Sequence, residues 1–531
     1  MSPTSSAGSY DSAPYPSLCY TQTTPNRLAS IATLLGMTPA PVDACRMLEL
    51  GTASGGNLIP LAKTYPQSTF VGIDYAARQI DAGQADVDSL GLKNITLRHA
   101  DIRALGDEVG EFDYIVAHGV YSWSPPEVRE ALLALCRRSL APQGVAFISF
   151  NALPGWHMLL AVREMMQFHT RGIEEPLARA RAAREFVQEL SRIGSPDGVL
   201  NSYLQAYGKM LVARWEMAES DALLLHDELE EINQPFYFHE FVTHARAHGL
   251  QYLAEAEFPQ VMLSNFKPDA AQQVATWSGQ DGVALEQYMD FVRFRTLRQT
   301  LLVHEEVTIR RHFAADPALV APFHFLTRAK IESDGSGLES AAPLALVTAD
   351  GGRLVSDHPV SKAALALLVG RRPAAIEFSE LLATARGMVK APADSADVDA
   401  RQLTLTLLRG LTYSFQLIEP QLGPAPYAVA LSDRPVASPV ARLQLAQGLP
   451  RVTNLRHERV QLDDLGRFLL ARLDGEHTRD ALLEELQQLA DDGFLVLKGN
   501  AEQTAAEAHA VLGTDLDEAL AFLLQAALLE R

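Results

Sequence analysis

A chain of 531 residues is too long for one hydrophobic core, and its length predicts about three or four domains. Apolar residues make up 47% and charged residues 21%, as in an ordinary globular protein, and the formal net charge of −20 argues against sequence-independent nucleic-acid binding, which needs a basic face. The three cysteines are far apart and offer neither a disulfide framework nor a metal-binding pair, which favours a reducing, cytoplasmic location.

Residues 1–43 are expected to form a segment ahead of the first strand. The beginning of this segment is polar and rich in Pro and Ser, which argues against a signal peptide, and the chain contains no apolar run of about 18 residues to span a membrane. Tyr10, Tyr15 and Tyr20 lie here, and aromatic rings attract a cationic ligand. Either the rings form a lid over a ligand site or they pack against the first helix, and the composition leaves both open.

Between residues 46 and 151 short apolar runs alternate with helical stretches, which indicates a parallel α/β sheet. The predicted strands are Arg46–Leu50, Thr69–Ile73, Ile95–His99, Phe112–Ala117 and Val145–Phe150. The predicted helices between them are Asn57–Thr64, Ala76–Leu90 and Pro126–Leu140.

Two later strands, Gln251–Ala254 and Arg298–His304, are candidates for the last two of seven, each preceded by a predicted helix, Phe238–His248 or Leu285–Leu297. On this interpretation residues 44–310 form one domain, and the helical residues 156–235 are an insertion in it. Arg293, Arg295 and Arg298 could bind an anion, but fit a solvated face better.

The composition changes beyond about residue 330, where loops are rich in Gly, Ser and Asp. Ser361–Arg386 and Leu465–Ala490 share one pattern: an apolar run, a glycine, a polar loop and a second apolar run. Both predict small helix-loop-helix units of winged-helix size, at residues 325–430 and 440–531. Pro420–Pro426 and Ser438–Pro450 are the expected linkers.

The strongest motif is MLELGTASGGN at residues 47–57, between the first strand and a helix. Ligands of open α/β sheets bind at this end of the strands, and glycines at 51, 55 and 56 allow a tight turn and a close backbone approach. The Walker pattern of a phosphate-binding loop is absent. The spacing E-x-G-x-x-x-G instead resembles the first motif of class I S-adenosylmethionine-dependent methyltransferases, in which Glu49 would favour the ammonium and sulfonium charges. Ala53 replaces the usual middle glycine.

Three further motifs follow successive strands in order. Asp74 ends the second strand and would bind the ribose hydroxyls, Asp101 follows the third near the adenine, and the HGVYSW segment at 118–123 follows the fourth near the methyl group. A helix-capping role explains Asp74 or Asp101 singly, but not the ordered series. The predicted cofactor-binding residues are Tyr15, Glu49, Gly51, Thr52, Gly55, Asn57, Asp74, Tyr75, Asp101, Ile102, His118 and Gly119.

Methylation of adenine, glutamine or a pyrimidine carbon is disfavoured, because the loops lack the motifs of those enzymes. The fourth strand is not followed by the Asp/Asn-Pro-Pro-Tyr/Phe sequence of adenine and glutamine methylases, and no cysteine is placed to attack a pyrimidine. His226, His239, His244 and His248 fit no compact metal-binding motif, so no metal site is predicted.

Together these residues resemble a family, the methyltransferases with a methyltransferase regulatory domain, which includes the rickettsial outer-membrane-protein lysine methyltransferases. The resemblance covers roughly residues 10–305. Besides the motifs above it rests on YDSAPY at 10–15, TPNRL at 24–28, NALPGW at 151–156, PFYFHEF at 235–241, GLQYLAE at 249–255 and RQTLL at 298–302. The tail is similar in plan to the C-terminal domain of the family, with less specific motifs.

The resemblance implies a Rossmann-like α/β fold with a seven-stranded sheet, a helical insertion and a mainly helical, winged-helix-like C-terminal region. It also implies S-adenosyl-L-methionine as the cofactor and a lysine acceptor, on a surface or outer-membrane protein before its export. The acidic charge is compatible with a basic, lysine-rich protein partner. No nucleic acid and no membrane insertion are expected, and a homodimer is left open.

Methyl transfer is an in-line displacement, so the protein must mainly hold the nucleophile and the methyl group in line. A lysine attacks only as the neutral amine, and burial among Tyr121, Trp123 and Trp156 would lower its pKa from about 10.4. Tyr20, His118 and Asn151 are expected to shape the acceptor site, and water or His118 could take the proton. Two alternatives stay open: a small-molecule O- or N-methyltransferase with the insertion as a lid, and a non-catalytic module that senses the cofactor.

Overall fold

In the computed structural model the described residues are 15–193, 199–218, 221–311, 313–332, 342–492 and 505–530. They divide into two compact units. The first holds the chain up to Leu18, Ile31–Ala62 and Pro66–Ile309, and the second holds Cys19–Ser30, Lys63–Tyr65 and the chain from Arg310 onward.

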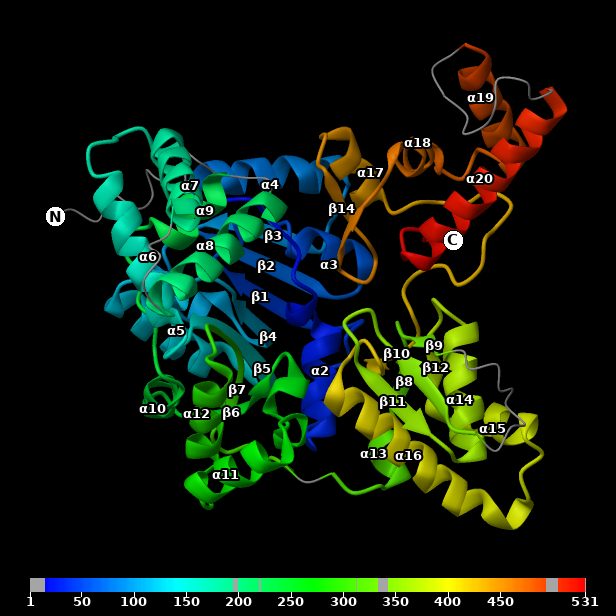
Figure 1. The fold of residues 1–531 in the computed structure, drawn as a ribbon, viewed down its shortest axis with the longest axis horizontal. Helices are drawn as coiled ribbons and strands as arrows, with labels where there is room; N and C mark the ends of the chain where they lie inside the picture. The colour runs from blue at the N-terminus through cyan, green and yellow to red at the C-terminus, as the bar shows by residue number, and fades with distance from the viewer. Residues whose placement is uncertain are drawn as a thin grey trace. The chain divides into compact units, whose positions relative to one another are not determined.

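A seven-stranded sheet forms the centre of the first unit (Figure 1). Its strands are β1 Arg46–Leu50, β2 Thr69–Asp74, β3 Ile95–His99, β4 Phe112–Ala117, β5 Leu140–Asn151, β6 Leu250–Glu255 and β7 Leu297–His304. The order is β3-β2-β1-β4-β5-β7-β6, and β7 runs antiparallel to both its neighbours while β1 to β5 are parallel. This arrangement confirms the predicted Rossmann-like sheet with its last two strands.

The helices that connect the parallel strands are α3 Leu58–Thr64, α4 Ala77–Ser89 and α5 Pro126–Ser139, each within one residue of its predicted bounds at either end. Pro126 stands in the first turn of α5, where its missing N–H costs nothing, and Arg137 and Arg138 stand in the last turn, where cations complement the helix dipole. The centre of the sheet is buried, because β1, β4 and β5 are buried along most of their length.

Four helices form the predicted insertion: α6 Trp156–His169, α7 Pro176–Ile193, α8 Val199–Ala218 and α9 Asp221–Glu228. They enclose a separate apolar cluster that includes Trp156, Met166, Val187, Leu211 and Trp215. The chain then returns to the sheet through α10 Phe238–Ala247, α11 Pro268–Ser278 and α12 Gly282–Arg293.

The predicted helix Leu285–Leu297 is wrong at both ends. The helix α12 begins at Gly282, where Asp281 caps it by accepting hydrogen bonds from Val283 N and Ala284 N. It ends at Arg293 because Phe294 takes a left-handed conformation with φ 53°. A non-glycine residue in that conformation leaves no signal in the sequence.

Two small sheets and four helices follow in the second unit. The strands are β8 Phe323–Leu326, β9 Lys330–Ile331, β10 Leu344–Val347, β11 Arg353–Ser356, β12 Ile376–Glu377 and β13 Glu419–Leu422, in the orders β12-β8-β13 and β11-β10-β9. The helices are α13 Pro317–Val320, α14 Pro359–Gly370, α15 Phe378–Met388 and α16 Ala396–Tyr413. The linker predicted at Pro420–Pro426 is wrong at its start, because Pro420–Leu422 pairs with β8 in β13.

The last part of the chain contains α17 Pro439–Ala446, β14 Arg451–Thr453, β15 Arg459–Gln461, α18 Asp464–Arg472, α19 Arg479–Asp491 and α20 Ala505–Gln525. Their core is rich in leucine, including Leu469, Leu482, Leu516 and Leu523. The predicted linker Ser438–Pro450 is wrong, because Ser438 caps α17 and Pro439 begins it. Among the described helices none has both the length and the apolar character needed to cross a bilayer.

Candidate active site

The loop after β1 is held by the buried carboxylate of Glu49. Its Oε2 accepts a hydrogen bond from Thr52 Oγ1 at 2.8 Å and its Oε1 accepts one from Asn57 Nδ2 at 2.7 Å. Burial raises the pKa of Glu49 to about 7, the two hydrogen bonds oppose the rise, and the charge of Asp74 adds to it. Three predicted cofactor residues thus form one hydrogen-bonded unit in this loop.

The glycines of the loop are required by close contacts. A Cβ at Gly51, where φ is +77°, would lie 2.6 Å from Val120 Cγ2 in the loop after β4, and one at Gly56 would lie 2.5 Å from the carbonyl oxygen of Ser17. Ala53, which replaces the usual middle glycine of the motif, also adopts a positive φ, of 51°. The departure from the motif therefore keeps the left-handed backbone at a small conformational cost.

Asp74 stands at the end of β2 beside this loop. Its Oδ2 accepts a hydrogen bond from Ala53 N and its Oδ1 accepts one from Ala76 N, both at 2.8 Å. Burial raises the pKa of Asp74, and these backbone donors oppose the rise. Each oxygen keeps a second lone pair, so the carboxylate can still accept hydroxyl donors. Tyr75, the next residue, is exposed.

Asp101 follows β3 and has a capping role. It accepts a hydrogen bond from Arg103 N at 2.8 Å at the start of the short helix Ile102–Ala104, and it forms an ion pair with the Arg103 guanidinium at 2.6 Å. The bonds to Arg103 lower the pKa of Asp101. The contacts of Asp101 are thus those of a helix cap, and its role and that of Ile102 at the adenine stay predictions.

His118 and Gly119 follow β4 and share one partner. Ser149 Oγ on β5 lies 2.8 Å from His118 Nδ1 and accepts a hydrogen bond from Gly119 N at 2.8 Å. Burial lowers the pKa of His118 to about 4, so the imidazole is neutral at neutral pH. This ring can orient a substrate group, but it is a weak proton acceptor.

Two indoles and two amides meet where β5 ends. The rings of Trp123 and Trp156 lie edge to face with centroids 6.4 Å apart. Trp156 Nε1 and Asn151 Nδ2 each donate to Asn233 Oδ1 at 3.0 Å, and Asn233 Nδ2 donates to the carbonyl oxygen of Asp227 at 2.8 Å. The structure thus brings together three of the predicted acceptor residues, Trp123, Trp156 and Asn151.

The orientation of the Asn151 amide follows from these partners. An indole nitrogen only donates, so it must face the oxygen of Asn233, and the atom of Asn151 that shares this oxygen must be its NH₂ group. The oxygen of Asn151 is left as a buried acceptor without a donor among the described residues. Such a group costs about 1–3 kcal/mol unless a donor reaches it.

Tyr121 is not among the residues that meet in this group. Tyr121 is buried in the core of the sheet against the rings of Phe150, Phe236 and Phe241, and its hydroxyl lies 2.6 Å from His244 Nδ1. Aromatic packing thus holds the Tyr121 ring in the core, and its role at the acceptor stays a prediction. Tyr20 belongs to the second unit, and its role stays a prediction.

A polar group on the insertion was missed by sequence reasoning. Asp227 forms an ion pair with Arg214 at 2.7 Å, and Tyr15 Oη lies 3.4 Å from Asp227 Oδ1. Burial raises the pKa of Glu228 to about 8, and the charge of Arg214 opposes the rise. Tyr15, predicted near the cofactor, is thus tied to the insertion. The acidic run at 227–231 was the only available signal, and it is typical of a solvated helix end.

Arg293, Arg295 and Arg298 were expected to form a solvated face, and this prediction is wrong for Arg295 and Arg298. Arg298 is fully buried and bonds Glu255, Glu286 and Asp290 within 3.1 Å, and Arg295 is buried against Asp290 at 3.1 Å. Buried charges of this kind must be paired, so these arginines serve the packing of α12 against β7.

Comparison with known proteins shows to which family the chain is related. The family models described as "Methyltransferase domain", "Predicted methyltransferase regulatory domain" and "PKMT, C-terminal winged helix domain" match residues 47–144, 220–304 and 433–528. The uncharacterized protein RP789 of Rickettsia prowazekii is 33% identical over 92% of this chain and 87% of its own length. The structure of PKMT2 from Rickettsia typhi in complex with AdoHcy superposes with a TM-score of 0.83 and 25% identity, covering 98% of this chain and all of the other.

The sheet, the glycine loop after β1 and these matches define a class I S-adenosylmethionine-dependent methyltransferase. Within this class, the chain belongs to the family of methyltransferases that carry a methyltransferase regulatory domain and a PKMT-type C-terminal winged helix domain. The predicted family, winged helix and cofactor are thereby confirmed. The domain bounds and the roles of single residues stay predictions.

Proposed function

We propose that this protein methylates lysine side chains of a protein substrate. The abbreviation PKMT, used for the matching winged-helix family and for the Rickettsia typhi structure, suggests a protein lysine methyltransferase. The acceptor would be a surface or outer-membrane protein methylated before export, as the family resemblance implies. Glu49 and Asp74 would place negative charge and acceptors at the cofactor, whose sulfonium supplies the electrophilic methyl group.

The observation that carries this proposal is the unpaired oxygen of Asn151 beside two indole rings. An amine that enters between these rings would donate one N–H to Asn151 Oδ1 and keep its lone pair for the methyl carbon. A donor that reaches this oxygen must displace the side chains that now shield it. The amide chain Asn151–Asn233–Trp156 fixes the oxygen in place, so little of its orientation is lost on binding.

The apolar rings have a second consequence for a lysine. Burial disfavours the charged ammonium and lowers its pKa from about 10.4, so more of the substrate is present as the reactive neutral amine. In the displacement the nitrogen lone pair forms the N–C bond, the S–C bond breaks, and its electron pair stays on the leaving sulfur. The methylated amine is cationic, and water takes its proton, because His118 with a pKa of about 4 is too weak a base.

The test is transfer of labelled methyl from S-adenosylmethionine into a cell lysate, separated into protein, nucleic-acid and small-molecule fractions. Alkali-stable label in a protein band, mapped to lysine in peptides, supports the proposal. Label confined to the small-molecule fraction would show a small-molecule methyltransferase instead. A chain that binds the cofactor and labels nothing would be a cofactor sensor.

A further inference from the structure

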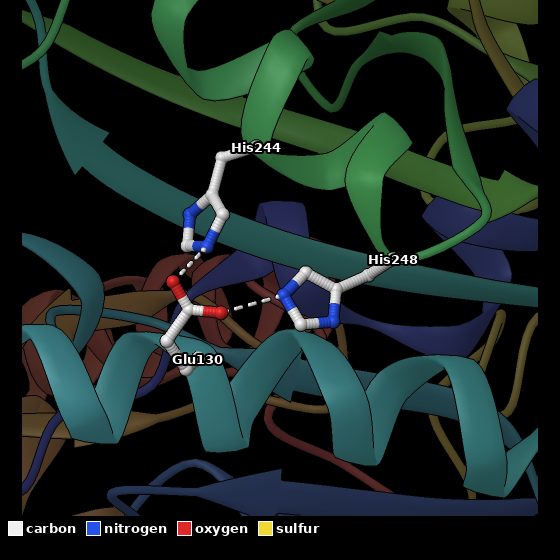
Figure 2. Close-up of side chains that lie close together, drawn as sticks. All are labelled: Glu130, His244 and His248. Atoms are coloured by element: carbon white, nitrogen blue, oxygen red, sulfur yellow. Dashed lines mark hydrogen bonds and ion pairs between the residues drawn. The ribbon is translucent and has the colours of Figure 1, made fainter.

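Three side chains converge between α5 and α10. Glu130 projects from α5, His244 from α10, and His248 from the residue that follows α10 (Figure 2). The Nε2 atom of His244 lies 3.0 Å from Glu130 Oε1, and that of His248 lies 2.9 Å from Oε2. One donor atom from each residue lies within 4.8 Å of the other two.

The two histidines can converge because they stand four residues apart. This spacing puts them on one face of a helix, one turn apart, as in helical metal-binding pairs. Figure 2 shows both rings turned toward the carboxylate, each toward a different oxygen. The Glu130 side chain is 60% exposed, while those of His244 and His248 are 23% and 19% exposed. The imidazoles are thus positioned by packing, and the carboxylate is free to adjust.

His244 also has the outer partner that metal-binding histidines require. Tyr121 Oη lies 2.6 Å from its Nδ1 and so orients the ring with Nε2 toward Glu130. The Tyr121 ring is itself held against Phe236 and Phe241 with centroids 5.1 Å away. Such an arrangement fixes the direction of the ligand nitrogen, and the Tyr121 hydroxyl can accept a hydrogen bond from Nδ1–H when Nε2 binds an ion.

We propose that Glu130, His244 and His248 bind a divalent transition-metal ion, for which Zn²⁺ is the best fit. Two imidazoles and one carboxylate are a donor set of zinc sites with an open position, where water or a further ligand completes the shell. Ligand atoms of a tetrahedral zinc ion are about 3.3 Å apart, given bonds of about 2.0–2.1 Å. Rotation of the exposed Glu130 and small shifts of the rings bring the three atoms to this spacing.

The proposed ion would be bound by residues from two different domains of the chain. Glu130 lies in the part of the chain that matches the methyltransferase domain, and both histidines lie in the part that matches the regulatory domain. A bound ion would fasten these two parts to each other. Through His244 and Tyr121 it would also reach the loop after β4 that begins with His118. The site does not depend on the identity of the methyl acceptor.

The experiment uses the full-length chain without a polyhistidine tag, stripped with a chelator, dialysed and titrated with Zn²⁺ by calorimetry. One equivalent of Zn²⁺ is expected to bind, and the same chain with Co²⁺ should show the visible absorption of a four- or five-coordinate ion. Glu130→Gln and His248→Ala should each weaken Zn²⁺ binding by at least about 100-fold, and Tyr121→Phe by about 10- to 100-fold. The matched controls are Glu127→Gln, an exposed carboxylate on the same helix, and His239→Ala, whose ring bonds Gln287 instead.

Absence of a one-equivalent site in the unmodified chain would overturn the proposal. So would a Zn²⁺ affinity that Glu130→Gln and His248→Ala leave unchanged, because the ion would then be bound elsewhere. Far-ultraviolet circular dichroism of each stripped variant separates lost binding from lost folding. If His248→Ala does not fold, the exposed Glu130→Gln decides the outcome.

Discussion

Glu49, which is predicted to bind the cationic cofactor, has a carboxyl group that burial makes hard to ionise. Its pKa is raised from 4.5 to about 7, so the folded chain keeps this proton between those values while an unfolded chain has lost it. Since the unfolded chain then binds fewer protons, the contribution of Glu49 to stability is fully present below about pH 4.5 and is lost as the pH rises toward 7.

The same shift predicts a pH dependence of cofactor affinity. A sulfonium favours the carboxylate form, so affinity for S-adenosylmethionine should rise by up to about tenfold per pH unit below 7 and level off above it. Calorimetric titration on both sides of pH 7 measures this. In the Glu49→Gln variant the affinity for S-adenosylmethionine should no longer show the pH dependence that comes from ionisation of Glu49. Parallel profiles for the two proteins would mean that Glu49 does not face the cofactor charge.

Asn151 is the residue that most directly tests the acceptor site. Asn151→Ala removes the unpaired oxygen, and kcat/KM should fall by about 10- to 100-fold, because one hydrogen bond to the amine is lost. Binding of S-adenosylhomocysteine, measured by calorimetry, should stay within about twofold, since the side chain is not expected to touch the cofactor. Equal loss of cofactor affinity and turnover would assign Asn151 to the core instead. Asn233→Ala should show a smaller loss, because Asn151 keeps its oxygen but not its orientation.

At the scale of elements, the turn after β1 depends on one glycine. Gly51→Ala would place a Cβ 2.6 Å from Val120 Cγ2 at a φ of +77°. We expect it to abolish detectable cofactor binding and to lower the free energy of unfolding by about 2–4 kcal/mol. Gly91→Ala is the matched control: its φ is +65° with no atom within 4 Å, so only about 1–2 kcal/mol should be lost. Denaturant unfolding and calorimetry compare the two, and similar losses in both would show that the Val120 contact is unimportant.

The sequence predicts well those helices and strands whose bounds depend on residues close to them in the chain. Strands such as β1 and β4 are buried apolar runs bounded by turns, and their predicted bounds match the structure. The errors occur where distant residues decide. Pro420–Leu422 has the composition of a linker, but it pairs with β8, which is far away in the sequence. The burial of Tyr121 likewise depends on His244 and Phe241, more than 100 residues later. Asn233 was missed because it acts through hydrogen bonds to Trp156 and Asn151, which are 77 and 82 residues away in the sequence.

For the whole molecule, the order of motifs along the chain was enough to predict the sheet and its cofactor end, since parallel strands place their carboxyl ends together. It was not enough to predict that Pro25–Leu34 begins within the second unit. There Asn26 makes two hydrogen bonds with the backbone of Leu422, across 396 residues. A pairing at that separation has no local signature, and it ties the start of the chain to β13.

The net charge of the whole chain predicts how it should meet a basic substrate. The chain has a formal charge of −20 and therefore attracts a lysine-rich segment. Added salt should remove this attraction, because the screening length falls from about 10 Å at 0.1 M to about 3 Å at 1 M. The KM for a basic acceptor peptide should therefore rise by about tenfold over this range while kcat changes little, because screening acts on the encounter and not on the bound, shielded amine. The control peptide keeps the acceptor lysine and has its other lysines and arginines replaced by glutamine. Its KM should start higher and depend weakly on salt, and an equal salt dependence for both peptides would show that the charge of the chain plays no part in choosing its substrate.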